Sequence, residues 1–113
     1  MTGMVAGARV GVGWDLHRLE AGRRFVIGGV SIPSSKGCVA HSDGDVLIHA
    51  VIDAILGAAG MDDIGTLFPD TDPSYCDVDS TELLSRVFEL VAARGFHVCN
   101  LDATIVLQSP KLG

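Results

Sequence analysis

Apolar residues fill most of the stretch 46–59, and the polar positions in and just before it recur every four residues, at Asp45, His49 and Asp53. On a helix this spacing places the three polar side chains in one narrow stripe. A helix that is apolar on its other sides is buried, so its polar stripe needs partners within the protein. The pattern therefore predicts a long buried helix over residues 42–60.

Two further stretches alternate apolar and polar positions, which is the period of a strand with one apolar face. Residues 9–17 place four apolar side chains on one face: Val10, Val12, Trp14 and Leu16. The opposite face, which its glycines are expected to leave open, carries Gly11, Gly13, Asp15 and His17. Residues 96–108 form the longest predicted strand, with apolar positions at Cys99, Leu101, Ala103, Ile105 and Leu107.

Turn signals divide the middle of the chain into shorter elements. Residues 25–32 predict two short strands joined by a hairpin turn at Gly28-Gly29. Residues 34–38 predict a loop. A second loop is expected over residues 62–79, which are polar and rich in turn-forming residues.

A second helix is predicted after this loop. Asp79 and Glu82 have the spacing of a capping box, and Gly95 is a suitable residue to follow the last turn. The apolar face of this helix carries Leu83, Leu84, Val87, Phe88, Leu90 and Val91. The order of elements predicts an α/β domain of the α+β sandwich type, with a mixed β-sheet packed on helices. We expect residues 9–113 to form this single domain and residues 1–8 to be a flexible extension.

Composition limits the classes of protein that fit this pattern. With 113 residues, of which 48% are hydrophobic and 19% charged, the chain can bury one core and is too apolar to be disordered. Its net charge of −6 argues against nucleic-acid binding, and no apolar window approaches the length of about 18 residues that a membrane span needs. An odd number of cysteines without C-x-x-C spacing argues against disulfides and a thiolate zinc site. This cysteine pattern predicts that Cys38, Cys76 and Cys99 are small buried side chains. It also predicts that the protein is cytoplasmic.

Residue types that bind metals occur on two predicted elements. Asp15 and His17 lie two positions apart on a strand, so their side chains point to one face, and His49 lies on the buried helix. Each feature alone has a structural explanation, as a surface polar pair or a hydrogen-bonded core histidine. Together they offer one carboxylate and two imidazoles with a fourth position open, the donor set of catalytic zinc. At least one of Asp45 and Asp53 is then expected to accept the other ring N–H of His49.

The start of the predicted long helix has the features of an anion site. His41 and Ser42 supply an imidazole and a hydroxyl beside free backbone N–H groups and the positive end of the helix dipole. Plain capping by Ser42 or Asp43 is the structural alternative. Two carboxylate-rich stretches, 63–65 and 68–72, fit the hydroxyl groups of a ribose or another polyol, with turn formation as their alternative.

Five blocks of sequence, in order along the chain, resemble the 2-C-methyl-D-erythritol 2,4-cyclodiphosphate synthase family. The blocks are Trp14-Asp15-Leu16-His17, Ile27-Gly28-Gly29-Val30-x-Ile32-Pro33, Ala40-His41-Ser42-Asp43-Gly44-Asp45-Val46, Asp63-Ile64-Gly65-x-Leu67-Phe68-Pro69-Asp70-Thr71-Asp72-Pro73 and Gln108-Ser109-Pro110-Lys111. The resemblance extends from about residue 9 to the last residue, and the combination of blocks is highly specific.

This resemblance implies an enzyme of non-mevalonate isoprenoid biosynthesis. Such an enzyme, a phosphorus–oxygen lyase, cyclises 4-diphosphocytidyl-2-C-methyl-D-erythritol 2-phosphate to 2-C-methyl-D-erythritol 2,4-cyclodiphosphate and releases CMP. In the family the 2-phosphate attacks the β-phosphorus, and Zn²⁺ with a second divalent cation, Mg²⁺ or Mn²⁺, neutralises the diphosphate. An acidic protein that binds a polyphosphate needs metal ions for this purpose.

Matching positions imply the residues of the site. Asp15, His17 and His49 match the zinc ligands. His41 matches the catalytic residue, and with Ser42 it positions the attacking phosphate. The remaining positions that the resemblance assigns to the substrate, which Asp15 and His17 also contact, are Leu16, Asp63, Ile64, Gly65, Phe68, Pro69, Asp70, Thr71, Asp72, Leu107, Gln108, Ser109, Pro110, Lys111, Leu112 and Gly113.

The family's sequence continues past the positions of Lys111 and Leu112, so the resemblance implies a C-terminally truncated synthase. The missing part would supply further nucleotide contacts and the glutamate for the second metal. Family members are homotrimers that share active sites between subunits, so a homotrimer is expected. Two alternatives stay open: a zinc phosphohydrolase that uses the same ligands to activate water, and an inactive zinc-binding fragment that assembles with full-length chains.

Overall fold

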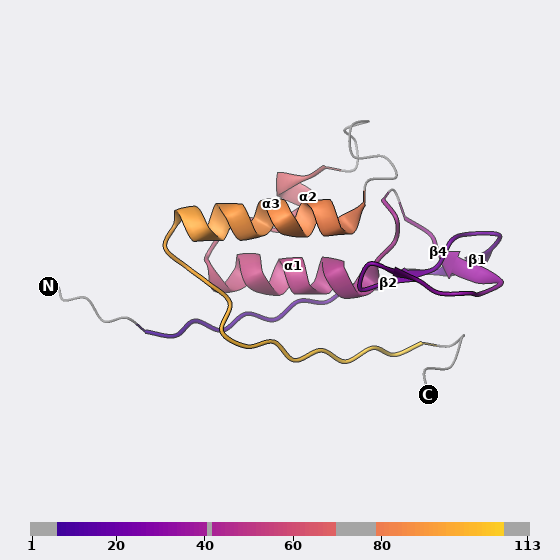
Figure 1. Ribbon diagram of the computed structural model, residues 1–113, viewed down its shortest axis with the longest axis horizontal. Coiled ribbons are helices and arrows are strands. Elements are labelled where there is room, and N and C mark those ends of the chain that lie inside the picture. Colours follow the sequence, from indigo (N-terminus) through magenta and orange to yellow (C-terminus); the bar gives the residue numbers. More distant parts are fainter. Residues whose placement is uncertain (1–6, 41, 70–78, 108–113) are drawn as a thin grey trace, which may run out of the picture.

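The computed structural model of the chain describes residues 7–40, 42–69 and 79–107. Two helices dominate it: α1 (Val46–Ala58) and α3 (Ser80–Ala93) lie side by side and run in the same direction (Figure 1). The sequence predicts both helices. Their parallel arrangement brings their N-terminal ends together, and the candidate site lies at this end.

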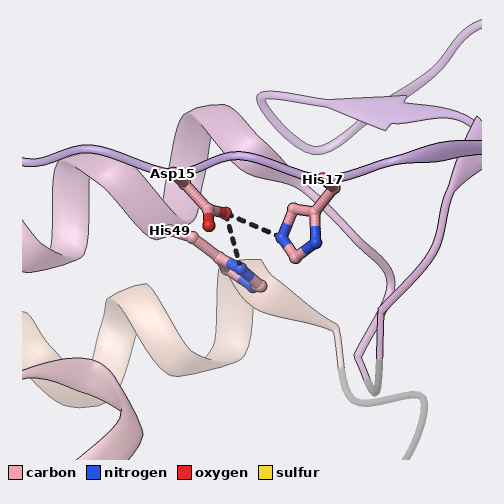
Figure 2. A group of neighbouring side chains, drawn as sticks. All are labelled: Asp15, His17 and His49. Atoms are coloured by element: carbon pink, nitrogen blue, oxygen red, sulfur yellow. Dashed lines mark hydrogen bonds and ion pairs between the residues drawn. The ribbon is translucent and has the colours of Figure 1, made fainter.

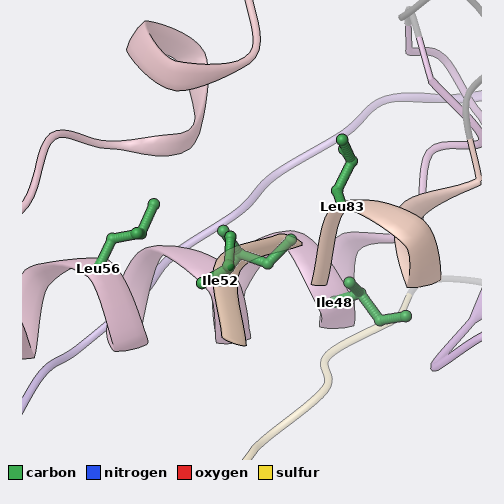
Figure 3. Close-up of a cluster of buried hydrophobic side chains, with 5 residues drawn as sticks. Ile48, Ile52, Leu56 and Leu83 are labelled. Atoms are coloured by element: carbon green, nitrogen blue, oxygen red, sulfur yellow. The ribbon is translucent and has the colours of Figure 1, made fainter. Parts of the chain in front are cut away.

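The main core lies between these two helices. Side chains four residues apart on α1 pack against side chains four residues apart on α3 (Figure 3), and the buried members are Ile48, Ile52, Leu56, Leu83 and Val87. This is the spacing that an amphipathic helix uses to bury one face. Phe88 and Leu90, which were predicted on the apolar face, are substantially exposed. They lie outside the row of α3 residues that faces α1.

The N-terminus of α1 differs from the prediction. Asp45 is the N-cap, and its carboxylate accepts a hydrogen bond from the backbone N–H of Ile48. The predicted caps, Ser42 and Asp43, both lie before Gly44, whose φ is 74°. A residue with positive φ cannot be part of a right-handed helix, so the helix begins only after Gly44.

The caps of α3 agree with the sequence in position and differ in detail. Asp79 is the N-cap, but its carboxylate accepts from the backbone N–H and hydroxyl of Thr81 instead of from the N–H of Glu82. At the other end Gly95 has a φ of 83°, as expected for the residue after the last turn.

A short helix, α2 (Ile64–Leu67), lies within the stretch that was predicted as a loop. Asp63 caps it by accepting from the N–H of Thr66, and Asp53 of α1 accepts from the N–H of Ile64 at 2.9 Å. Two aspartates therefore stabilise this single helical turn. The helix was not predicted because four residues are too few to show a helical period in the sequence.

The described strands form two antiparallel pairs. β2 (Val26–Ile27) and β3 (Val30–Ser31) make the predicted hairpin around Gly28-Gly29, both with positive φ, as a two-residue turn of this kind requires. β1 (Leu19–Ala21) pairs with β4 (Lys36–Cys38).

The strand β4 replaces part of the loop predicted over residues 34–38. Its central residue, Gly37, lies so close to the backbone that a Cβ there would be 2.0 Å from the carbonyl oxygen of Arg24. Gly37 is therefore needed for a close backbone contact within a strand. In the sequence alone, a glycine at this position is interpreted as part of a loop. Cys38 is buried as predicted, whereas Cys99 is exposed, and Cys76 lies outside the described residues.

The two long strands predicted over residues 9–17 and 96–108 form no ladder within the described residues. Both segments are extended and pass along one side of α1 (Figure 1). The alternation predicted for the first segment is present, and its apolar face is turned outward. Its apolar side chains are exposed, Trp14 by 86% and Leu16 by 92%, while the glycine and polar positions face the protein.

Short strand pairs beside helices place the protein in the predicted α+β class. A second, smaller core links the strands to the extended segment near residue 107 and consists of Phe25, Ile27 and Cys38 with Ile105 and Leu107 packed against them. Within the described residues, none of the helices has the length and apolarity to cross a membrane. The N-terminal extension predicted at residues 1–8 lies mostly outside the described part of the chain.

Candidate metal centre

The structure brings Asp15, His17 and His49 together, as the sequence predicts (Figure 2). Asp15 Oδ2 lies 2.9 Å from His17 Nε2 and 3.2 Å from His49 Nδ1. The three potential ligand atoms all lie within 4.8 Å of one another. Between 13% and 20% of each side chain is exposed, so the group is largely buried but remains in contact with solvent.

Two glycines position the first two of these residues. The segment that carries Asp15 and His17 lies directly against α1, and a Cβ at Gly13 would lie 1.8 Å from the carbonyl oxygen of Ala50. Gly11 makes the same kind of contact with Ala54. Because side chains alternate along an extended chain, Asp15 and His17 share the glycine face and point at the helix. The prediction that the glycines leave this face open is wrong, since the helix backbone occupies the space.

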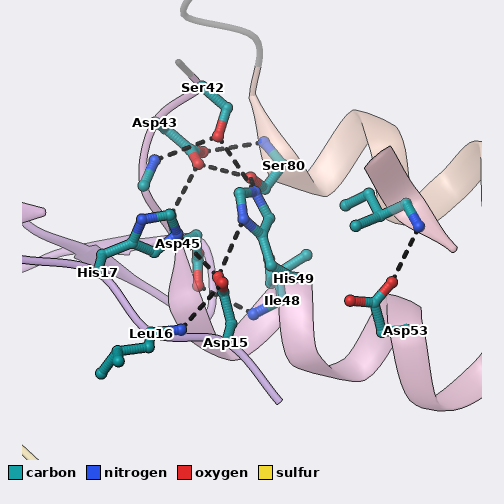
Figure 4. A network of polar contacts seen from close by, with 12 residues as sticks. Asp15, Leu16, His17, Ser42, Asp43, Asp45, Ile48, His49, Asp53 and Ser80 are labelled. Atoms are coloured by element: carbon teal, nitrogen blue, oxygen red, sulfur yellow. Dashed lines mark hydrogen bonds and ion pairs between the residues drawn. The ribbon is translucent and has the colours of Figure 1, made fainter. Parts of the chain in front are cut away.

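The outer nitrogen of each imidazole has a protein partner. His17 Nδ1 lies 3.0 Å from the carbonyl oxygen of Val39. His49 Nε2 lies 2.8 Å from Ser80 Oγ and 3.1 Å from Ser42 Oγ (Figure 4). In metal sites such contacts fix the ring orientation and the tautomer of a histidine ligand.

The expectation that at least one of Asp45 and Asp53 accepts the ring N–H of His49 is wrong. Asp45 caps α1 and also accepts from the N–H groups of Gly28 and Gly29, at 3.0 and 2.7 Å, so it connects the hairpin to the helix. Asp53 instead accepts from α2. Helical spacing places both carboxylates one turn from His49, but backbone donors that are distant in sequence take their oxygens.

The donor set tests whether a metal ion fits here. A carbonyl oxygen only accepts, so the bond to Val39 requires a proton on Nδ1 of His17 and directs its Nε2 lone pair at Asp15. A lone pair and a carboxylate oxygen cannot approach to 2.9 Å without a proton or a cation between them. One oxygen and two nitrogens around such a point are the ligands that zinc prefers.

The electrostatics of the metal-free chain agree with this argument. Burial raises the pKa of Asp15, but hydrogen bonds from His17 and His49 outweigh it and hold that pKa well below its usual range. The hydrogen bond to Asp15 raises the pKa of His17, against the opposing effect of burial. A proton on His17 thus compensates the carboxylate, and a metal ion would replace that proton.

The structure places some of the other predicted site residues near this group. Ser42 lies beside His49, and its Oγ also accepts from the N–H of Gly44. Asp63 and Ile64 form the start of α2, which Asp53 attaches to α1 one turn beyond His49.

Other predicted site residues lie apart from it or cannot be placed. Phe68 packs at the edge of the main core and lines a shallow hollow with Arg86 and Leu90 of α3, while Leu107 packs on the smaller core. The exposed side chain of Leu16 points away from α1. The predicted residues that lie outside the described part of the chain are His41, Asp70, Thr71, Asp72, Gln108, Ser109, Pro110, Lys111, Leu112 and Gly113.

Comparison with known proteins identifies the family of the chain. A profile of the YgbB family matches residues 8–113. The chain belongs to the YgbB family. It is 58% identical over 104 residues to the 2-C-methyl-D-erythritol 2,4-cyclodiphosphate synthase of Geobacter sulfurreducens, covering 92% of this chain. It is 54% identical over 109 residues to the synthase of Nitrosospira multiformis, covering 96% of this chain.

Solved structures agree with the sequence comparison. A 2-C-methyl-D-erythritol 2,4-cyclodiphosphate synthase in a CDP-bound form has a TM-score of 0.72 and 52% identity, over 77% of this chain and 58% of that one. The YgbB chain described here spans 66% of the length of the Geobacter relative and 62% of the Nitrosospira relative. The α+β fold is therefore shared with synthases of this family.

Proposed function

We propose that this YgbB chain carries the zinc-binding part of a 2-C-methyl-D-erythritol 2,4-cyclodiphosphate synthase active site. The observation that supports the proposal is the convergence of Asp15, His17 and His49 at distances of 2.9 and 3.2 Å, in a chain that is 58% identical to a named synthase. The reaction is the cyclisation of 4-diphosphocytidyl-2-C-methyl-D-erythritol 2-phosphate, with release of CMP.

In this proposal the three residues hold one Zn²⁺, which supplies positive charge to the diphosphate when it is bound. Phosphoryl transfer depends mainly on positioning and charge stabilisation. Val39 and Ser80 orient the two imidazoles, and Gly13 lets the segment with Asp15 reach α1. The hydroxyl of Ser42, beside His49, is placed to contact a phosphate oxygen of the substrate, with His41 as its neighbour in the sequence.

The remaining assignments rest on the resemblance alone. Residues 63–65 and 68–72 contact the sugar and the methylerythritol hydroxyls, and residues 107–113 begin the loop that holds cytosine. A second divalent cation, Mg²⁺ or Mn²⁺, completes the charge balance. The assembly is a homotrimer, which light scattering on the purified protein would test.

Metal binding provides the first test. The purified chain should contain one equivalent of zinc by elemental analysis, and His49→Ala should remove it. The matched control is His97→Ala, because His97 is an exposed histidine on the segment 96–107 and lies away from the site. Stoichiometric zinc in His49→Ala at wild-type affinity would contradict the assignment.

Product analysis tests the reaction and separates it from the alternative. With the natural substrate, ³¹P NMR should show a cyclic diphosphate together with CMP, and a chelator should abolish both signals. A zinc phosphohydrolase would instead release inorganic phosphate, without a cyclic product. The match to cyclodiphosphate synthases favours the first outcome.

A further inference from the structure

A chain of hydrogen bonds leads from His49 to two buried polar residues that the sequence does not single out as partners, Ser80 and Asp43 (Figure 4). His49 Nε2 lies 2.8 Å from Ser80 Oγ. The Ser80 hydroxyl donates to Asp43 Oδ1 at 2.5 Å, and the Ser80 backbone N–H donates to Asp43 Oδ2 at 2.9 Å. Ser80 is 0% exposed and Asp43 9% exposed. We call Asp43 and Ser80 the relay.

The relay fixes the direction of each hydrogen bond. Asp43 accepts from the hydroxyl and the backbone N–H of Ser80 and from the N–H of Asp45 at 3.1 Å. The only proton of the Ser80 hydroxyl is thus committed to Asp43, so Ser80 Oγ can only accept from His49. Nε2 of His49 must therefore carry a ring proton, so Nδ1, which lies 3.2 Å from Asp15, is the nitrogen that remains to face a metal ion.

We propose that Asp43 and Ser80 are positioning residues for the metal centre, which hold His49 in the tautomer that presents Nδ1 to the metal ion. The relay does for His49 what the Val39 carbonyl does for His17. Among the described residues, the partners of His49 Nε2 are the Ser80 and Ser42 side chains, whereas the partner of His17 is a backbone carbonyl. The inference rests on the proposed metal centre and assigns it two further residues.

Ser42 shows why this tautomer needs the relay. Ser42 Oγ also lies within reach of His49 Nε2, at 3.1 Å, and accepts from the N–H of Gly44, so its own hydroxyl proton is available to donate. Without the Ser80 oxygen, Ser42 can donate to Nε2 and the ring proton can move to Nδ1, opposite the Asp15 carboxylate. That tautomer cannot bind a metal ion through Nδ1.

The position of the relay also connects the site to the second helix. Ser80 is the first residue of α3, and Asp43 satisfies one of the free N–H groups at the start of that helix. A change at Ser80 could therefore act through helix stability alone. The adjacent residue offers a matched control, because the Asp79 carboxylate caps the same helix through Thr81, while His49 is bonded to Ser80.

The experiment compares Ser80→Ala with Asp79→Ala in the full chain. Zinc affinity is measured by competition with a chelator, and the geometry of the site is followed by the absorption spectrum of bound Co²⁺. We expect Ser80→Ala to weaken zinc binding by about 10–100-fold and to change the Co²⁺ spectrum. Asp79→Ala should lower the melting temperature but keep zinc affinity within about twofold of wild type. Equal losses of affinity in the two variants, or no loss in Ser80→Ala, would overturn the proposal.

A second measurement needs only the metal-free wild-type chain. Long-range ¹H–¹⁵N NMR of the His49 ring at mildly alkaline pH should show a proton on Nε2, and a ring whose only proton is on Nδ1 would overturn the relay. This readout also separates the two proposals. A wild-type chain that binds no zinc refutes the proposed metal centre, while the NMR spectrum still decides the relay. A chain that binds zinc and carries the proton on Nε2 but does not form the cyclic product refutes only the proposed reaction.

Discussion

The helix pair α1–α3 and the two extended segments, residues 7–18 and 96–107, bury their apolar side chains to very different degrees. In the helix pair the predicted apolar rows meet each other and form the main core. In the extended segments most apolar side chains remain exposed, and no backbone ladder is formed within the described residues. A helix satisfies its backbone hydrogen bonds within itself, whereas an extended segment needs a neighbouring strand to do so.

The candidate metal centre lies where these two regions meet. His49 comes from the well-packed helix α1, while Asp15 and His17 come from an extended segment that glycine contacts hold against it. We infer that the position of the segment 7–18 depends on its contact with α1 and on the interactions of Asp15 and His17 with His49. The three predictions below test this dependence, from the largest expected effect on stability to the smallest.

The largest contrast should come from deleting one apolar side chain in each region. Ile52→Ala removes a side chain that is 0% exposed in the main core, and we expect a loss of about 2–5 kcal/mol in the free energy of unfolding. Val12→Ala, at a position that is 73% exposed, should cost less than about 0.5 kcal/mol. Urea unfolding followed by circular dichroism measures both. A comparable loss in Val12→Ala would mean that the segment's apolar face is buried in solution.

The contact between the two regions should be sensitive to one methyl group. In Gly13→Ala the new Cβ would lie 1.8 Å from a carbonyl oxygen of α1, so the segment must shift away from the helix. We expect a loss of about 1–3 kcal/mol in the free energy of unfolding, together with weaker zinc binding. The control is Gly57→Ala on α1, where nothing lies within 4 Å and a gain of about 0.5–1 kcal/mol is expected. Unchanged zinc affinity in Gly13→Ala would show that the close approach does not position Asp15 and His17.

The smallest effect should be a pH dependence that originates at the same junction. The raised pKa of His17 adds stability below its unfolded value near 6.5, and this contribution is lost as the pH rises through the raised value. The lowered pKa of Asp15 adds stability above its unfolded value near 3.8, which is lost as the pH falls. The metal-free chain should therefore gain most from this pair between about pH 4 and 6.5.

The variant His17→Gln isolates this contribution. Between pH 5.5 and pH 8.5 the metal-free wild type should lose about 1 kcal/mol or less relative to His17→Gln, measured by urea unfolding at both pH values. The direction decides the interpretation. A wild type that gains stability relative to the variant as the pH rises would contradict a protonated His17 paired with Asp15.

The sequence by itself determined the parts of this protein whose signals are local. The run of apolar residues from 46 to 59 predicts α1, the caps at Asp79 and Gly95 locate α3, and Gly28-Gly29 predicts the hairpin. Residue chemistry also identified Asp15, His17 and His49 as a group, since same-face spacing and metal-binding side chains are visible without a structure.

Only the tertiary structure decided which groups surround that site. Asp43 and Ser80 lie 37 residues apart and meet because two helices run in parallel, and no spacing along the chain records this. Asp45 and Asp53 have the right helical spacing to contact His49, but donors from the hairpin and from α2 occupy them. The face of the segment 7–18 that turns inward was decided by the space available. The glycine face can approach the helix backbone closely, whereas the larger side chains of Val12 and Trp14 would prevent this approach and face outward.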